Sequence, residues 1–113
     1  MSNLEASPSS FDAAPVFAAL GDPTRLSLLR KLSSGESQSI ARLSSDTRLT
    51  RQAVTKHLRV LEDAGLVRSN RIGRESQYAF RPEAIDAARS YLEGVAQQWA
   101  DALDRLRAFV ERE

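Results

Sequence analysis

The sequence contains no cysteine and only one histidine, His57. The lack of cysteine excludes disulfides, thiolate metal sites, iron–sulfur clusters and cysteine nucleophiles. One histidine is too few for a histidine-rich metal centre, and the chain has no Gly-rich phosphate loop. We therefore expect no metal ion, no cofactor and no enzymatic activity.

Long apolar runs are also missing. No stretch of about 18 apolar residues is present that would span a membrane. The N-terminus has neither the basic leader nor the apolar segment of a secretory signal. These absences predict a cytoplasmic protein that makes no membrane contact. The 113 residues, of which 42% are hydrophobic and 27% charged, suit a single globular domain.

The charges nearly cancel over the whole chain but are unevenly placed. Residues 21–81 carry twelve basic and six acidic side chains, whereas residues 82–113 carry four basic and seven acidic ones. Residues 48–81 alone hold eight basic side chains against three acidic ones. Such clustering suits a phosphate backbone as partner, but an Arg-rich solvated surface would have the same composition.

The N-terminal third predicts a tail followed by two helices. Residues 1–11 are rich in Ser and lack periodicity, which indicates a flexible tail. The apolar stretch Pro15–Leu20 predicts a brief helix. Asp22 can cap a second helix that begins at Pro23, since a proline at the first helical position loses no hydrogen bond. The apolar face of that helix is expected to contain Leu26, Leu29 and Leu32.

The next segment predicts a helix-turn-helix. Ser37 is the cap candidate for a short helix around Ile40–Leu43. Thr50 can cap a longer helix that runs from Arg51 to Ala64 and is stopped by a glycine. Two helices joined by a turn, the second beginning with polar and basic residues, are typical of this motif.

A β-hairpin and a long helix complete the predicted order. Strands are expected at about Leu66–Arg71 and Glu75–Phe80, with Gly73 in the turn. Pro82 opens a helix that extends to about residue 111. The predicted fold class is therefore mainly α with a small β-hairpin, a winged helix-turn-helix.

The helix after Thr50 has a basic, hydrogen-bonding face opposite an apolar face. At about 100° per residue, Val54, Leu58 and Leu61 fall on the apolar side. Arg and Lys can pair with guanine edges or phosphates, and Gln can read adenine. The candidate DNA contacts on this segment are Thr50, Arg51, Gln52, Thr55, Lys56 and Arg59. Any surface helix is amphipathic, so an ordinary solvated face is the alternative.

His57 lies within the same helix but on another side of the wheel. It falls beside Leu61 and Ala64. This position favours a packed or hydrogen-bonded core histidine over a DNA contact. A lone imidazole without cysteine or a second histidine would need several carboxylates to bind a transition metal.

Basic residues also flank the turn of the predicted hairpin. Arg71 and Arg74 stand on either side of Gly73. An Arg-bearing hairpin after a helix-turn-helix can act as a wing that lies along the DNA backbone or enters the minor groove. The alternative is an edge hairpin that charge protects from aggregation.

The last predicted helix has a seven-residue apolar repeat. Its two series are Ile85, Leu92, Trp99 and Leu106, and Ala88, Val95, Ala102 and Phe109. This pattern is typical of a helix that pairs with another helix. About 30 helical residues extend roughly 45 Å, more than one small core needs, so we expect a homodimer. Packing across the chain's own domain is the alternative.

Residues 16–25, which include Gly21-Asp22-Pro23-Thr24-Arg25, and residues 50–67 resemble the ArsR/SmtB family of winged-helix repressors. Tyr91-Leu92, Gln98-Trp99 and Leu103-Asp104-Arg105-Leu106 are similar to the last helix of a metal-independent branch. The resemblance covers about residues 14–110 and implies a homodimer joined through its N- and C-terminal helices. It implies the interface residues Val16, Phe17, Leu20, Leu92, Val95, Trp99, Leu103 and Leu106.

The sequence departs from that family in its metal ligands. Where many members carry a cysteine pair, residues 39–43 read Ser-Ile-Ala-Arg-Leu, and the last helix has no histidine. Metal sensing and thiol-based sensing are therefore not expected. Residues 44–49 also make a longer turn than is usual in the family.

We hypothesise a dimeric, sequence-specific transcriptional regulator that acts as a repressor on a near-palindromic, double-stranded DNA operator. Residues 12–81 would form its DNA-binding domain and residues 82–113 its dimerisation helix. A winged-helix module for protein–protein interaction, without specific DNA binding, is the alternative from another functional class. The sequence does not distinguish release by a small-molecule effector, release by a protein effector and release by simple dilution.

Overall fold

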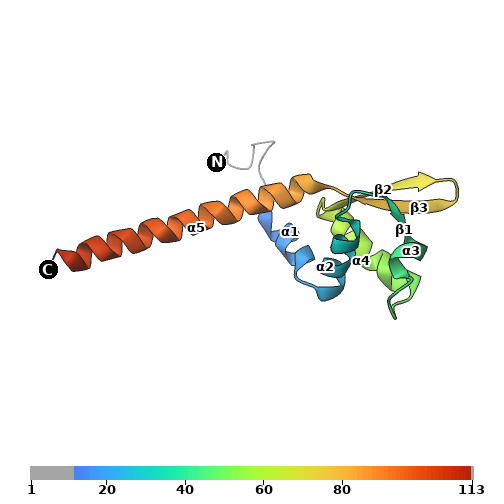
Figure 1. Ribbon diagram of the computed structural model, residues 1–113, viewed down its shortest axis with the longest axis horizontal. Coiled ribbons are helices and arrows are strands. Elements are labelled where there is room, and N and C mark those ends of the chain that lie inside the picture. Colours follow the sequence, from blue (N-terminus) through green and yellow to red (C-terminus); the bar gives the residue numbers. More distant parts are fainter. Residues whose placement is uncertain (1–11, 113) are drawn as a thin grey trace, which may run out of the picture.

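The computed structural model describes residues 12–112, which contain five helices and three strands. Figure 1 shows a body formed by the earlier elements and a long final helix that projects from it. The helices are α1 Ala13–Leu20, α2 Pro23–Leu32, α3 Ile40–Ser44, α4 Arg51–Asp63 and α5 Pro82–Glu111. The strands are β1 Gln38–Ser39, β2 Val67–Ile72 and β3 Glu75–Phe80. The predicted tail, residues 1–11, lies outside the described residues.

Two helices begin at the caps that the sequence predicts. The carboxylate of Asp22 accepts a hydrogen bond from the backbone N–H of Arg25 at 3.0 Å, at the start of α2. The hydroxyl of Thr50 accepts from the backbone N–H of Ala53 at 3.0 Å, at the start of α4. Each bond satisfies a backbone donor that has no partner within the helix.

A short third strand was not predicted, and it changes where α3 begins. β1 pairs antiparallel with β3, and Ser39 lies opposite Gln77. Ser39 is therefore the last extended residue, and its hydroxyl accepts a hydrogen bond from the backbone N–H of Arg42 at 3.1 Å. The prediction of Ser37 as the cap is wrong for this reason. A two-residue strand is too short to show the alternation that reveals strands in a sequence.

β2 and β3 form the predicted hairpin, and the order of the sheet is β1-β3-β2. The register runs from Val67 opposite Phe80 to Ile72 opposite Glu75. Gly73 lies in the turn with a φ of 62°, a left-handed conformation that glycine adopts without steric cost. The mainly helical, winged fold is confirmed, and β1 adds an edge to its sheet.

The core lies between the helices of the body and the base of the sheet. The fully buried residues of α4 are Val54, Leu58 and Leu61, as the helical wheel predicts. In α2 the buried leucines are Leu28, Leu29 and Leu32. The prediction that Leu26 shares this face is wrong: Leu26 is 47% exposed, because Leu28 lies one turn before Leu32 and takes the inward position.

The final helix gives the molecule an elongated shape. The extents are 69 × 34 × 21 Å and the radius of gyration is 19.2 Å, whereas a compact chain of this length would have a radius of about 13 Å. The first turns of α5 contact the body: Ala88 is buried, and the rings of Phe17 and Tyr91 lie 5.9 Å apart. The rest of the helix extends away from the body (Figure 1).

Candidate nucleic-acid interface

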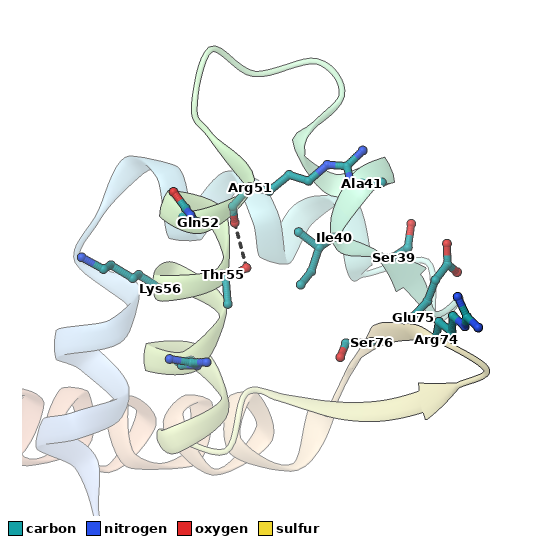
Figure 2. Close-up of a pocket in the computed structure, with 11 residues that line it drawn as sticks. Ser39, Ile40, Ala41, Arg51, Gln52, Thr55, Lys56, Arg74, Glu75 and Ser76 are labelled. Carbon is teal, nitrogen blue, oxygen red and sulfur yellow. Dashed lines mark hydrogen bonds between the residues drawn. The ribbon is translucent and has the colours of Figure 1, made fainter.

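A groove lies between the first turns of α4 and the tip of the β2–β3 hairpin, and we call it the α4–wing groove (Figure 2). The side chains that line it are Ser39, Ile40, Ala41, Arg51, Gln52, Thr55, Lys56, Arg59, Arg74, Glu75 and Ser76. Six of the eight predicted DNA contacts thus come together here. The other two, Thr50 and Arg71, are exposed but do not line the groove.

The buried face of α4 determines where its polar face points. With three apolar side chains in the core, Arg51, Gln52 and Lys56 are left exposed. In Figure 2 the Arg51 side chain reaches over Ala41 of α3, whereas Lys56 lies on the side of α4 away from Arg74. The cationic groups therefore surround the N-terminal end of α4. The unpaired backbone donors of a helix N-terminus add further positive potential at this end.

The two threonines of this segment are partly committed to the helix itself. The Thr50 hydroxyl oxygen accepts the cap bond, so its hydrogen remains available. The Thr55 hydroxyl donates to the carbonyl of Arg51 at 2.7 Å (Figure 2), so its oxygen can still accept a bond. Thr50 can therefore still donate a hydrogen bond to a ligand and accept one more, whereas Thr55 can act only as an acceptor.

A contact at its base ties the wing to α4. The Ser69 hydroxyl of β2 donates to the Glu62 carboxylate of α4 at 2.8 Å. Tyr78 of β3 is buried beneath the wing, and burial raises the pKa of its hydroxyl, as does the nearby Glu62 charge. The buried Tyr78 side chain packs in the core and so fixes the hairpin to it. Arg71 and Arg74 remain exposed on either side of the turn.

The groove also contains one acidic side chain that the sequence pattern did not single out. Glu75 follows Arg74 directly and lines the groove beside it. Among residues 12–112 its carboxylate forms no ion pair, and its hydrogen-bond donor is the side-chain amide of Gln77 at 3.4 Å. The groove thus holds the cations of Arg51, Lys56, Arg59 and Arg74 and one carboxylate.

His57 belongs to a network at the junction of α1, α2 and α4, away from the groove. The Arg25 guanidinium donates to the backbone carbonyls of Ala19 and Ala18 at 2.7 and 3.2 Å. Its Nη1 lies 3.3 Å from Nδ1 of His57, and the Asp22 carboxylate lies 3.8 Å from that nitrogen. The backbone N–H of Arg25 lowers the pKa of Asp22, and the guanidinium charge lowers it further. His57 is the hydrogen-bonded histidine that its place on the wheel favours.

A second ion pair holds the turn before α4. The ammonium group of Lys31 in α2 donates to the Asp46 carboxylate and to the Leu43 carbonyl, the latter at 3.1 Å. The Lys31 hydrogen bond lowers the pKa of the Asp46 carboxyl. The turn between the two helices of the motif is therefore attached to the body, which limits where α4 can point.

The predicted interface residues fall into two groups. On α5 the exposed apolar side chains form one stripe: Leu92 at 52%, Trp99 at 66%, Leu103 at 57% and Leu106 at 58%, with Val95 half-buried among them. On α1, Phe17 and Leu20 are half-buried, whereas Val16 is only 4% exposed. Val16 therefore packs in the chain's own core and leaves almost no surface for a partner.

The described part of the chain contains neither a membrane-spanning helix nor a cluster of metal ligands. None of its helices is long and apolar enough to cross a membrane. No three carboxylate or imidazole side chains between residues 12 and 112 lie close enough together to hold a metal ion.

Comparisons with known proteins agree with this geometry. A helix-turn-helix domain model matches residues 20–70. An HTH-type transcriptional regulator of Bacillus subtilis, YuzN, is 42% identical over 76 residues, which are 62% of this chain and 83% of that protein. YuzN is itself described as uncharacterized.

Solved structures of transcriptional regulators resemble a larger share of this chain. An ArsR-like transcriptional regulator from Rhodococcus sp. RHA1 is 35% identical with a TM-score of 0.82, covering 88% of this chain and 91% of that one. A homodimeric winged helix-turn-helix DNA-binding domain from Mycobacterium bovis is 29% identical with a TM-score of 0.57, covering 78% and 77%.

Fold and groove together define the class, a winged helix-turn-helix transcriptional regulator. The chain belongs to the ArsR family of these regulators. The names of the Bacillus subtilis and Rhodococcus relatives describe transcriptional regulators.

Proposed function

We propose that this protein is a cytoplasmic, homodimeric repressor that binds a specific double-stranded DNA operator. The observation that carries the proposal is the α4–wing groove, which four cationic side chains from two separate elements line. Residues 12–81 act as the DNA-binding domain. The N-terminal end of α4 enters the major groove, where Arg51, Gln52 and Lys56 contact base edges and phosphates. Arg71 and Arg74 of the wing contact the flanking backbone.

The apolar stripe of α5 supports the dimeric part of this proposal. Residues 82–113 act as the dimerisation helix, and Phe17 and Leu20 of α1 add to the interface. Large side chains such as Trp99 and Leu106 are more than half exposed in the single chain, an arrangement that a second apolar surface would stabilise. A two-fold dimer places two recognition helices about one DNA turn, roughly 34 Å, apart and therefore selects a near-palindromic operator.

Release from DNA is proposed to follow from a small-molecule or protein effector, without a metal ion. The residues at positions 39–43 offer no thiolate or imidazole, and α5 carries no histidine. Metal-independent regulation is supported by this absence of the usual ligand types.

The proposal is tested by footprinting the purified protein on its own promoter region over a salt series. We expect a protected inverted repeat, and binding that weakens about a thousandfold or more between 50 and 200 mM salt if the dimer contacts roughly six phosphates. Equal retention of random DNA, without a protected site, would contradict the proposal. A flat salt dependence would favour the alternative of a protein–protein interaction module.

A further inference from the structure

The carboxylate of Glu75 lies in a groove whose other charged side chains are cationic, so the groove does not only attract phosphate. Residues 48–81 contain three acidic side chains. Glu62 is bonded to Ser69 at the base of the wing, and Asp63 is the last residue of α4, at the end remote from the groove. Glu75 alone of the three lines the α4–wing groove. Its negative charge therefore stands where the DNA would lie.

The local structure fixes Glu75 at this place. It is the first residue of β3 and lies opposite Ile72 in the ladder, directly after the turn. In Figure 2 its carboxylate lies on the wing side of the groove near Ser39, across from Arg51. The side chain is exposed and forms no ion pair within the described residues. No neighbouring cation neutralises the charge by direct contact, so a molecule in the groove meets it.

Two kinds of DNA group respond to this carboxylate in opposite ways. A phosphate placed near it is repelled, and like charges at an interface suppress wrong partners. An exocyclic amino group of a base donates a hydrogen bond to it, whether N4 of cytosine in the major groove or N2 of guanine in the minor groove. The carboxylate therefore favours a complex in which a base edge faces the wing side and disfavours one in which only backbone does.

We propose that Glu75 is a specificity-determining residue, which weakens binding to random DNA and accepts a hydrogen bond from a base amino group in the operator. This inference rests on the proposed function and names one residue that separates operator from random sequence. The surrounding cations supply attraction to any DNA, since phosphate contacts carry no sequence information. Glu75 weakens that attraction where a phosphate lies next to its carboxylate and strengthens it where a base amino group does.

The test compares Glu75→Gln with the unchanged chain on two duplexes, measured by fluorescence anisotropy at one fixed salt concentration. One duplex is the site selected from a random pool by the unchanged protein, and the other is a scrambled duplex of the same composition. We expect Glu75→Gln to bind the scrambled duplex about two- to fivefold more tightly, the range measured for one exposed charge pair. Binding to the selected site should stay equal or weaken, so the ratio of the two affinities falls.

Glu93→Gln is the matched control, because it removes the same charge from an exposed position of α5 outside the groove. It should leave the affinity ratio unchanged. The proposal is overturned if Glu75→Gln leaves the ratio unchanged or raises it, or if Glu93→Gln lowers it equally. A further variant, Glu75→Ala, shows whether the glutamine amide itself makes a new contact, and it must also lower the ratio. If the unchanged protein selects no site, the proposed function fails, which is a result distinct from failure of the Glu75 role.

Discussion

The body of the molecule and the outer part of α5 contain similar apolar side chains in opposite surroundings. In the body, Leu58 and Leu61 of α4 are fully buried. On α5, Leu103 and Leu106 are 57% and 58% exposed. The body therefore covers these leucines within one chain, whereas the outer part of α5 leaves its leucines exposed. The comparison separates residues that stabilise the fold of the single chain from residues that a second apolar surface could cover.

The two regions also differ in how their polar groups are used. In the body, Arg25 and Lys31 reach across elements to bind carbonyls and carboxylates. On α5 the side-chain hydrogen bonds of Arg89 with Asp86 and of Gln97 with Asp101 are local. Long-range contacts orient α4 relative to α1 and α2, while local ones only support a single helix. The contacts that orient the α4–wing groove therefore lie within the body.

The largest expected effect comes from removing a side chain of the buried region. Leu58→Ala leaves a cavity beneath α4 and should lower the free energy of unfolding by about 3 kcal/mol. Urea unfolding followed by circular dichroism measures this loss. The matched change Leu103→Ala, on the exposed stripe, should instead weaken the dependence of unfolding on protein concentration. If both variants lost the same free energy of unfolding at every protein concentration, the two regions would not differ in the way proposed.

The next effect concerns the exposed stripe. Trp99→Ala should weaken the proposed dimer by about 2 kcal/mol, roughly 30-fold in Kd, because large aromatic residues dominate such interfaces. Sedimentation equilibrium gives the dissociation constant directly. Gln97→Ala, on the opposite side of α5, is the control and should leave it unchanged. An unchanged constant for Trp99→Ala would show that the stripe does not form the interface.

A third effect lies on the polar face of α4, the proposed DNA-facing surface of the body. Arg51→Ala and Gln52→Ala should each weaken operator binding by about 1.5 kcal/mol, roughly tenfold, since each removes one contact to a base edge or phosphate. Anisotropy titrations measure the loss, and sedimentation should show the dimer intact. Arg105→Ala on α5 serves as the control for loss of one cationic side chain. A loss of dimer in either α4 variant would mean that this face of α4 was assigned wrongly.

Much of the fold could be predicted because its signals are local. Asp22 and Thr50 are caps directly before their helices, and Gly73 marks its turn. The apolar spacing of α4 predicted which side is buried. The wrong prediction for α2 shows the limit of such spacing. Both Leu26 and Leu28 lie at helical intervals from the buried leucines of this helix, and only packing against the body decides that Leu28 is buried.

The features that were missed depend on contacts between distant residues. β1 exists because Gln38 meets Tyr78, 40 positions later in the chain. Arg25 reaches His57, 32 positions away, and no spacing rule indicates that pair. Glu75 was counted among the charges, but only the register of the hairpin and the approach of α4 place it in the groove. Sequence patterns predicted the buried and polar faces of α4, whereas tertiary packing determined which side chains share the groove.

The smallest expected effect tests the junction that links α1 to α2. The pKa of Asp22 is lowered from 3.8 in the folded protein, chiefly by the backbone N–H of Arg25. A carboxyl with a lowered pKa stabilises the fold above its unfolded value, and that contribution is lost as the pH falls through the folded value. Asp22→Asn keeps a capping side chain but removes this titration. Urea midpoints measured from pH 6 down to about pH 2 should therefore decline less steeply below pH 4 for the variant than for the unchanged chain. Superimposable profiles would show that the junction gains no stability from the charge of Asp22, and that its cap bond alone fixes the start of α2.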